Sequence, residues 1–132
     1  MTSTKSAIHH YQQTQFTTSD RGHILLLMFD GGLRFLGLAR RGLEQGDLVQ
    51  FGHNLGRAQA VIAELLHTLD HKAGGEIARN LERLYRFMLG RLTEANLTKN
   101  AQYITDVVRV LETIAGAYRE IIEQKVPQVD AA

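Results

Sequence analysis

Residues 47–69, DLVQFGHNLGRAQAVIAELLHTL, carry an apolar residue at alternating intervals of three and four positions. A repeat of about 3.5 residues places these side chains along one side of an α-helix, where they can pack against other helices. Asp47 comes directly before the run and is a suitable N-cap. The stretch therefore predicts one helix of a bundle. Its expected inward-facing residues are Leu48, Phe51, Leu55, Ala58, Ile62, Leu65 and Leu69.

Three other segments have the same helical periodicity. One covers about residues 20–45, with Ser19 or Asp20 as its N-cap and Gly46 as its stop. Another follows a glycine-ended joint over residues 71–75, and the last covers residues 101–125 after a cap at Thr98 or Asn100. The expected inward-facing residues are Ile77, Leu81, Leu84, Met88, Leu92 and Ala95 in the third helix, and Ile104, Val107, Leu111, Ile114, Tyr118 and Ile121 in the fourth.

The joints between these segments are short, which forces neighbouring helices to run antiparallel. The sequence therefore predicts an all-α fold, an antiparallel up-down-up-down four-helix bundle over residues 19–125. Residues 1–18 are polar with few apolar anchors, so we expect a mobile N-terminal arm. For residues 126–132 we expect a disordered tail.

Charge and composition exclude several classes of function. Fifteen Lys and Arg residues against fourteen Asp and Glu residues leave a net charge of +1, so no strong field attracts nucleic acid or an anionic membrane. The most apolar run, ILLLMFDGGLRFLGLA at 24–39, is interrupted by Asp30 and Arg34, too early for a membrane-spanning helix. The N-terminus has no apolar signal sequence and the chain has no cysteine, so we expect a cytoplasmic protein.

Candidate catalytic and metal motifs are incomplete. Glu64 and His67 have the Glu-x-x-His spacing of di-iron bundles, but the chain lacks the second such pair that the site requires. His67 and His71 are four residues apart, and no third ligand can be identified. No serine lies in a nucleophile motif. We therefore expect no enzyme activity, no metal and no cofactor.

The first helix has more apolar surface than one side of a bundle requires. Two of its faces carry apolar rows, and the fourth helix adds a row at seven-residue intervals. These extra rows have three alternative interpretations: close packing in a small bundle, a surface for a partner, or a homodimer interface. Gly31 and Gly32 suit a close backbone approach, within the bundle or at a partner. The rows are Ile24, Met28, Gly31, Phe35 and Leu38; Leu26, Phe29, Leu33, Leu36 and Leu43; and Tyr103, Val110 and Ala117.

The order of several short motifs resembles the FliS family of flagellin export chaperones. The resemblance runs from about residue 8 to about residue 120, and the order and spacing of the motifs are more specific than any one of them. The motifs are YQQT (11–14), TTSD (17–20), LMFDG (27–31), RFL (34–36), GGEIA (74–78), NL (80–81), RL (91–92) and EAN (94–96).

This resemblance implies a chaperone that binds the disordered C-terminal segment of flagellin in the cytoplasm. Such a chaperone prevents premature polymerisation and assists delivery to the flagellar export apparatus. It also implies that the N-terminal arm, with Tyr11 at the matching position, can cover part of the binding surface. An export-gate protein or an anti-sigma factor as further partner stays open, as does a self-assembling homodimer without a flagellin client. Together with the apolar rows, the resemblance gives these client-binding candidates: Ile8, Tyr11, Leu26, Phe29, Leu33, Leu36, Tyr103, Val110 and Ala117.

Overall fold

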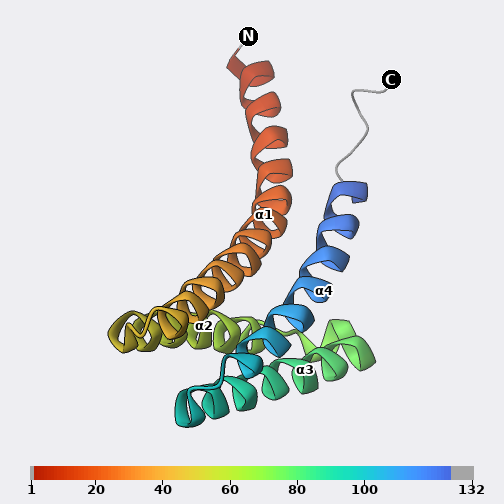
Figure 1. The fold of residues 1–132 in the computed structure, drawn as a ribbon. Helices are drawn as coiled ribbons and strands as arrows, with labels where there is room; N and C mark the ends of the chain where they lie inside the picture. The colour runs from red at the N-terminus through yellow and green to blue at the C-terminus, as the bar shows by residue number, and fades with distance from the viewer. Residues whose placement is uncertain (1, 126–132) are drawn as a thin grey trace.

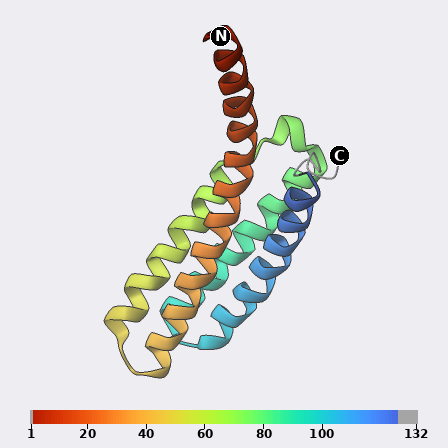
Figure 2. The same cartoon turned by 90° about the horizontal axis from the view of Figure 1, so that it is seen from above.

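The computed structural model describes the backbone of residues 2–125 and the side chains of residues 21–124. Over this range the chain forms four helices, α1 (Thr2–Glu44), α2 (Leu48–His67), α3 (His71–Thr98) and α4 (Ala101–Lys125). Successive helices run in opposite directions (Figures 1 and 2). The all-α, up-down-up-down bundle expected from the sequence is thereby confirmed.

The four helices are arranged as a ring in chain order. α1 packs against α2 and α4, and α3 packs against the same two helices from the opposite side. Figure 2 shows α1 in front, between α2 on one side and α4 on the other, with α3 behind. Each helix therefore has one side toward the shared core and two flanks toward its neighbours.

The predicted boundaries around α2 and at the start of α4 are confirmed by hydrogen bonds or backbone angles. The Asp47 carboxylate accepts a hydrogen bond from the Gln50 backbone N–H (3.1 Å), and Gly46 has a positive φ of 72°. Asn100 caps α4 by accepting a hydrogen bond from the Gln102 backbone N–H (2.9 Å). These local contacts satisfy backbone groups that a helix end leaves unpaired. The predicted joint over residues 71–75 is wrong, because α3 begins at His71 and only Gly75 within it has non-helical backbone angles.

The predicted start of the first helix at Ser19 or Asp20 is wrong, because α1 begins at Thr2. Neither Pro nor Gly lies between residues 2 and 20 to stop a helix, and an N-cap preference of about 1 kcal/mol does not by itself end one. The N-terminal part of α1 extends past the ends of the other helices (Figures 1 and 2). The mobility of the arm stays a prediction, and the expected tail over residues 126–132 lies outside the described residues.

The core rows of α2 and α4 are as expected along their central turns. On α2 the row from Phe51 to Leu65 is buried, and on α4 the row from Ile104 to Ile114 is buried. The predictions for the row ends are wrong for Leu48, which is 56% exposed, and for Ile121, which is 48% exposed. Both lie near the ends of their helices, where less of the bundle is available to cover them.

The predicted core row of α3 is wrong at two positions. Ile77 is 70% exposed and Leu84 is 39% exposed, whereas their neighbours Ala78 and Tyr85 are buried. The observed row keeps alternating intervals of three and four residues throughout, which the predicted row did not. It consists of Ala78, Leu81, Tyr85, Met88, Leu92 and Ala95, of which Leu81 is partly buried.

The core side of α1 depends on small residues rather than on either predicted apolar row alone. Gly32 and Gly42 are buried in line with Phe29, Leu36 and Ala39. A Cβ atom at Gly32 would lie 3.2 Å from Leu111 and 3.3 Å from Val61. At Gly42 it would lie 2.7 Å from the backbone nitrogen of Phe51. These glycines allow α2 and α4 to approach α1 closely, inside the bundle.

We predict that Gly42→Ala lowers the free energy of unfolding by about 1–3 kcal/mol, because the new methyl group would overlap the backbone at the start of α2. Gly31→Ala is the matched control, since a Cβ there meets nothing within 4 Å. The control should raise stability by up to about 1 kcal/mol through helix propensity. Urea unfolding of both variants measures the difference, and equal stability of the two would contradict the close approach at Gly42.

Candidate interaction surface

Large apolar side chains remain exposed along the flank of α3 that adjoins α4. Ile77, Leu84 and Phe87 are 70%, 39% and 43% exposed. On the facing flank of α4, Tyr103 and Val110 are partly buried and Ala117 is exposed. We call these six residues, together with Arg91, the α3/α4 strip.

Arg91 shows that the two halves of the strip lie on one face. Its guanidinium carbon is 5.1 Å from the centroid of the Phe87 ring and 5.3 Å from that of the Tyr103 ring. In an antiparallel pair, a step of seven residues back along one helix matches a step of seven forward along the other. This spacing places Leu84 at the level of Val110, and Ile77 at the level of Ala117. The strip is thus a row of apolar residues on neighbouring flanks with a cation–π contact at one end.

The structure divides the predicted client-binding residues into separate groups. Phe29 and Leu36 are fully buried at 0% exposure, so the prediction that they lie on an accessible surface is wrong. The Phe29 ring packs instead against Tyr118, with 5.4 Å between ring centroids. Leu26 and Leu33 are partly buried and pack on the core. The Ile8 and Tyr11 side chains lie outside the described part of the chain.

The α1 and α4 candidates do not form one surface. Leu26 and Leu33 precede Arg40 at seven-residue steps on α1, and Arg40 donates a hydrogen bond to the Thr105 hydroxyl of α4 (3.3 Å). They therefore lie on the flank of α1 that adjoins α4. Tyr103 contacts Arg91 of α3, so the α4 candidates lie on the other flank of that helix.

Sequence reasoning missed Ile77 and Leu84 as surface residues because it assigned both to the core. The signal that identifies them is the regular spacing of Ala78, Leu81, Tyr85 and Met88, which leaves positions 77 and 84 together on the adjacent flank. The periodicity of α3 alone does not favour this row strongly, since Leu84 and Tyr85 are both large and apolar enough to be buried.

Asp30, within the LMFDG motif, connects α1 to α4. Its carboxylate oxygen Oδ1 accepts a hydrogen bond from Nη2 of Arg119 (2.8 Å). The two side chains are 55% and 44% exposed, so water screens the pair and its contribution to stability is small. The contact aligns the two helices on the surface at the level of the buried Phe29.

A second feature is an open pocket at the end of the bundle from which α1 projects. This end pocket has a volume of about 350 Å³ and is lined by residues of all four helices. The residues that define its apolar walls are Leu65, Leu69, Ile77, Leu81, Tyr85 and Tyr118. Burial, with a smaller contribution from neighbouring Tyr118, raises the pKa of Tyr85 well above its usual value.

The described side chains do not assemble a metal centre. No group of three His, Asp or Glu residues is placed to hold a metal ion within residues 21–124. Glu64 and His67 are both exposed, so neither projects into the core as a di-iron ligand would.

Despite the interruption by Asp30 and Arg34, one segment among the described residues, Arg21–Glu44 of α1, is long and apolar enough to cross a membrane by length and composition. In the bundle, its Phe29, Leu36 and Ala39 side chains form part of the core. Packing against other helices therefore accounts for the apolar character of these positions.

The fold and the strip together define a small helical-bundle protein with an apolar surface suited to binding another polypeptide. Comparison with known families identifies it further. The model of the family described as flagellar protein FliS matches residues 4–125, and the chain belongs to the FliS family.

Individual relatives are similar to this chain in sequence over most of its length. The flagellar secretion chaperone FliS of Salmonella typhimurium is 42% identical over 123 residues, which cover 89% of this chain and 91% of the relative. The flagellar secretion chaperone FliSB of Pseudomonas aeruginosa is 34% identical, with coverage of 85% and 92%. The FliS chaperone of Vibrio cholerae is 30% identical, with coverage of 82% and 79%.

The end pocket predicts a specific loss of stability at alkaline pH. The raised pKa of Tyr85 means that the folded protein keeps this phenol neutral, while the unfolded chain ionises it from about pH 10. The free energy of unfolding should therefore fall as the pH rises above 10. In Tyr85→Phe the free energy of unfolding should fall less steeply with pH, by up to about 1.4 kcal/mol per pH unit. Urea unfolding of both proteins between pH 9 and 11 measures this dependence. The same pH dependence in both proteins would contradict the burial of Tyr85.

Proposed function

We propose that this protein is a cytoplasmic export chaperone that binds the disordered C-terminal segment of flagellin. By occupying that segment it prevents premature polymerisation and assists delivery to the flagellar export apparatus. Membership of the FliS family supports an export-chaperone role, and the relatives are named flagellar secretion chaperones. The observation that carries the proposal is the exposed α3/α4 strip.

The chemistry of the strip suits an amphipathic segment that folds as it binds. Ile77, Leu84 and Phe87 offer apolar contacts, and they recur along α3 at intervals that a client helix can match. Arg91 adds a cation beside the apolar row, which suits a client segment that also carries acidic or polar side chains. Ordering a disordered chain is costly, so a large apolar interface is needed to offset it.

The need for area suggests a client that contacts more than one flank. In this proposal Tyr103, Val110 and Ala117 contact one part of the client segment. Leu26 and Leu33, on the flank of α1 that adjoins α4, contact another part. Phe29 and Leu36 support these surfaces from the core rather than touching the client. The arm residues Ile8 and Tyr11 stay candidates for direct contact or for covering the surface before the client binds.

The exposed α3/α4 strip has an alternative explanation, in which the protein forms a homodimer. Apolar residues on an exposed flank can also bury themselves against a second copy of the chain. The two functions make different demands, because a chaperone must bind flagellin through the C-terminal segment and a self-assembling bundle need not bind flagellin at all.

The deciding experiment mixes the protein with intact flagellin and with flagellin that lacks its C-terminal segment, then measures the mass of the complexes by light scattering after size exclusion. We predict a complex with intact flagellin only. A protein that binds neither form would contradict the proposal, and a dimeric mass without flagellin binding would favour the homodimer.

We predict that Leu84→Glu lowers the affinity for flagellin at least about tenfold, because it places a charge in the middle of the apolar strip. Val49→Glu is the matched control, since Val49 is 79% exposed on α2, away from the strip. Calorimetric titration of both variants with flagellin measures the effect. Equal losses, or no loss in Leu84→Glu, would remove the strip from the binding surface.

A further inference from the structure

The start of α3 is bent sharply at one residue. Gly75 has φ 53° and ψ −122°, a conformation that glycine adopts easily and that side chains with a Cβ disfavour. The preceding residue is equally restricted, because a Cβ at Gly74 would lie 2.9 Å from the Cβ of Ala78. Residues 70–74, which we call the flap, are therefore set at an angle to the remainder of α3.

The flap forms one wall of the end pocket. Asp70, Ala73 and Gly74 line the pocket across from apolar residues of the other helices, among them Leu65 and Tyr118. Figure 2 shows this short turn, in green, at the end of the bundle from which α1 projects. Access from solvent to the buried Tyr85 therefore depends on where the flap lies.

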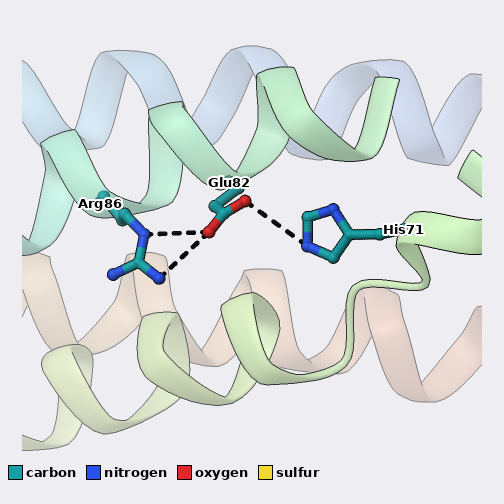
Figure 3. Close-up of polar contacts among 3 residues, drawn as sticks. All are labelled: His71, Glu82 and Arg86. Atoms are coloured by element: carbon teal, nitrogen blue, oxygen red, sulfur yellow. Dashed lines mark hydrogen bonds and ion pairs between the residues drawn. The ribbon is translucent and has the colours of Figure 1, made fainter. Parts of the chain in front are cut away.

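A side-chain contact connects the flap to the helix beyond the bend. The imidazole nitrogen Nε2 of His71 lies 3.5 Å from carboxylate oxygen Oε2 of Glu82. The other Glu82 oxygen accepts hydrogen bonds from Nε and Nη2 of Arg86, at 3.2 and 3.1 Å. Figure 3 shows the carboxylate between the two side chains. Arg86 thus orients Glu82, and Glu82 holds His71.

Two further polar contacts lie within the flap itself. The Asp70 carboxylate accepts a hydrogen bond from the Ala73 backbone N–H (3.0 Å), and the Asp70 carbonyl accepts one from the Gly74 N–H (2.8 Å). Both bonds can be kept when the flap moves as a unit. The His71, Lys72 and Ala73 side chains are exposed, so little apolar burial holds the flap down.

We propose that residues 70–74 are a hinged flap that opens about Gly74 and Gly75, is held closed by the contact between His71 and Glu82, and uncovers the end pocket when it opens. The movement requires no client, so it goes beyond the export function and does not depend on it. Opening exposes Leu65 and Tyr85, which the closed flap helps to cover.

Hydrogen exchange measured by mass spectrometry tests the latch in the free, full-length protein. Glu82→Ala should speed exchange of the backbone amides of residues 71–77 about two- to fivefold, as expected for loss of one partly exposed side-chain contact. Amides of residues 84–95 should keep their rates. Glu94→Ala, at an exposed glutamate of the same helix, is the matched control and should change neither region. Unchanged rates over residues 71–77 in Glu82→Ala would overturn the latch.

A second variant tests the hinge separately. Gly75→Ala should disfavour the bent conformation, speed exchange over residues 71–77 about tenfold and increase the fluorescence of anilinonaphthalene sulfonate as the pocket opens. Gly90→Ala is the matched control within α3, because a Cβ there meets nothing within 4 Å. If Gly75→Ala leaves exchange and dye fluorescence as in the wild type, the hinge is overturned. Because flagellin is absent from both tests, their failure would leave the chaperone proposal intact.

Discussion

The close approach of α1 to its neighbours at Gly32 and Gly42 is the constraint on which the remaining structure depends. At Gly42 the backbone of Phe51 occupies space that a side chain on α1 would need, so the turn after α1 can be short and α2 can return directly along it. At Gly32, the lack of a side chain lets Val61 of α2 and Leu111 of α4 pack directly against α1. Two neighbours can therefore pack on α1 at once, which fixes the ring of helices.

That ring decides which apolar residues are left for a partner. With α1 holding α2 and α4, α3 closes the ring from the far side by burying its Ala78-to-Ala95 row. Ile77 and Leu84 then stay on the flank next to α4, beside Arg91 and its two aromatic neighbours. The strip is thus a consequence of the core register of α3, and the surplus apolar surface is on α3 as well as on α1.

Much of the fold could be predicted from the sequence because its signals are local. Asp47, Gly46 and Asn100 act within one turn of the positions they cap, and the rows of α2 and α4 are regular enough to define their inner faces. The register of α3 could not be predicted as well, since Leu84 and Tyr85 are both suitable core residues and the tertiary fit chooses between them. The core side of α1 could not be chosen from the sequence, because two of its faces carry apolar rows. Gly32 was a candidate for a close approach within the bundle or at a partner, and the structure places it inside the bundle together with Gly42.

The candidate site was predictable only in part, because tertiary packing decides which apolar residues stay on the surface. The α4 residues Tyr103, Val110 and Ala117 could be inferred as a row outside the main core row, and they lie on the strip. Phe29 and Leu36 could not be separated from Leu26 and Leu33 without knowing how far α1 is buried. The end pocket and its flap depend on the Gly75 backbone conformation and on contacts between distant residues, which periodicity does not contain.

The most direct test of the account is methyl NMR of the protein, labelled at Ile, Leu and Val, during titration with the C-terminal segment of flagellin. The account predicts that the methyl signals of Ile77, Leu84 and Val110 shift or broaden most, while those of Val49 and Leu97, which are 79% and 73% exposed away from the strip, stay in place. Changes confined to Val49 and Leu97, or none at saturating flagellin segment, would contradict it.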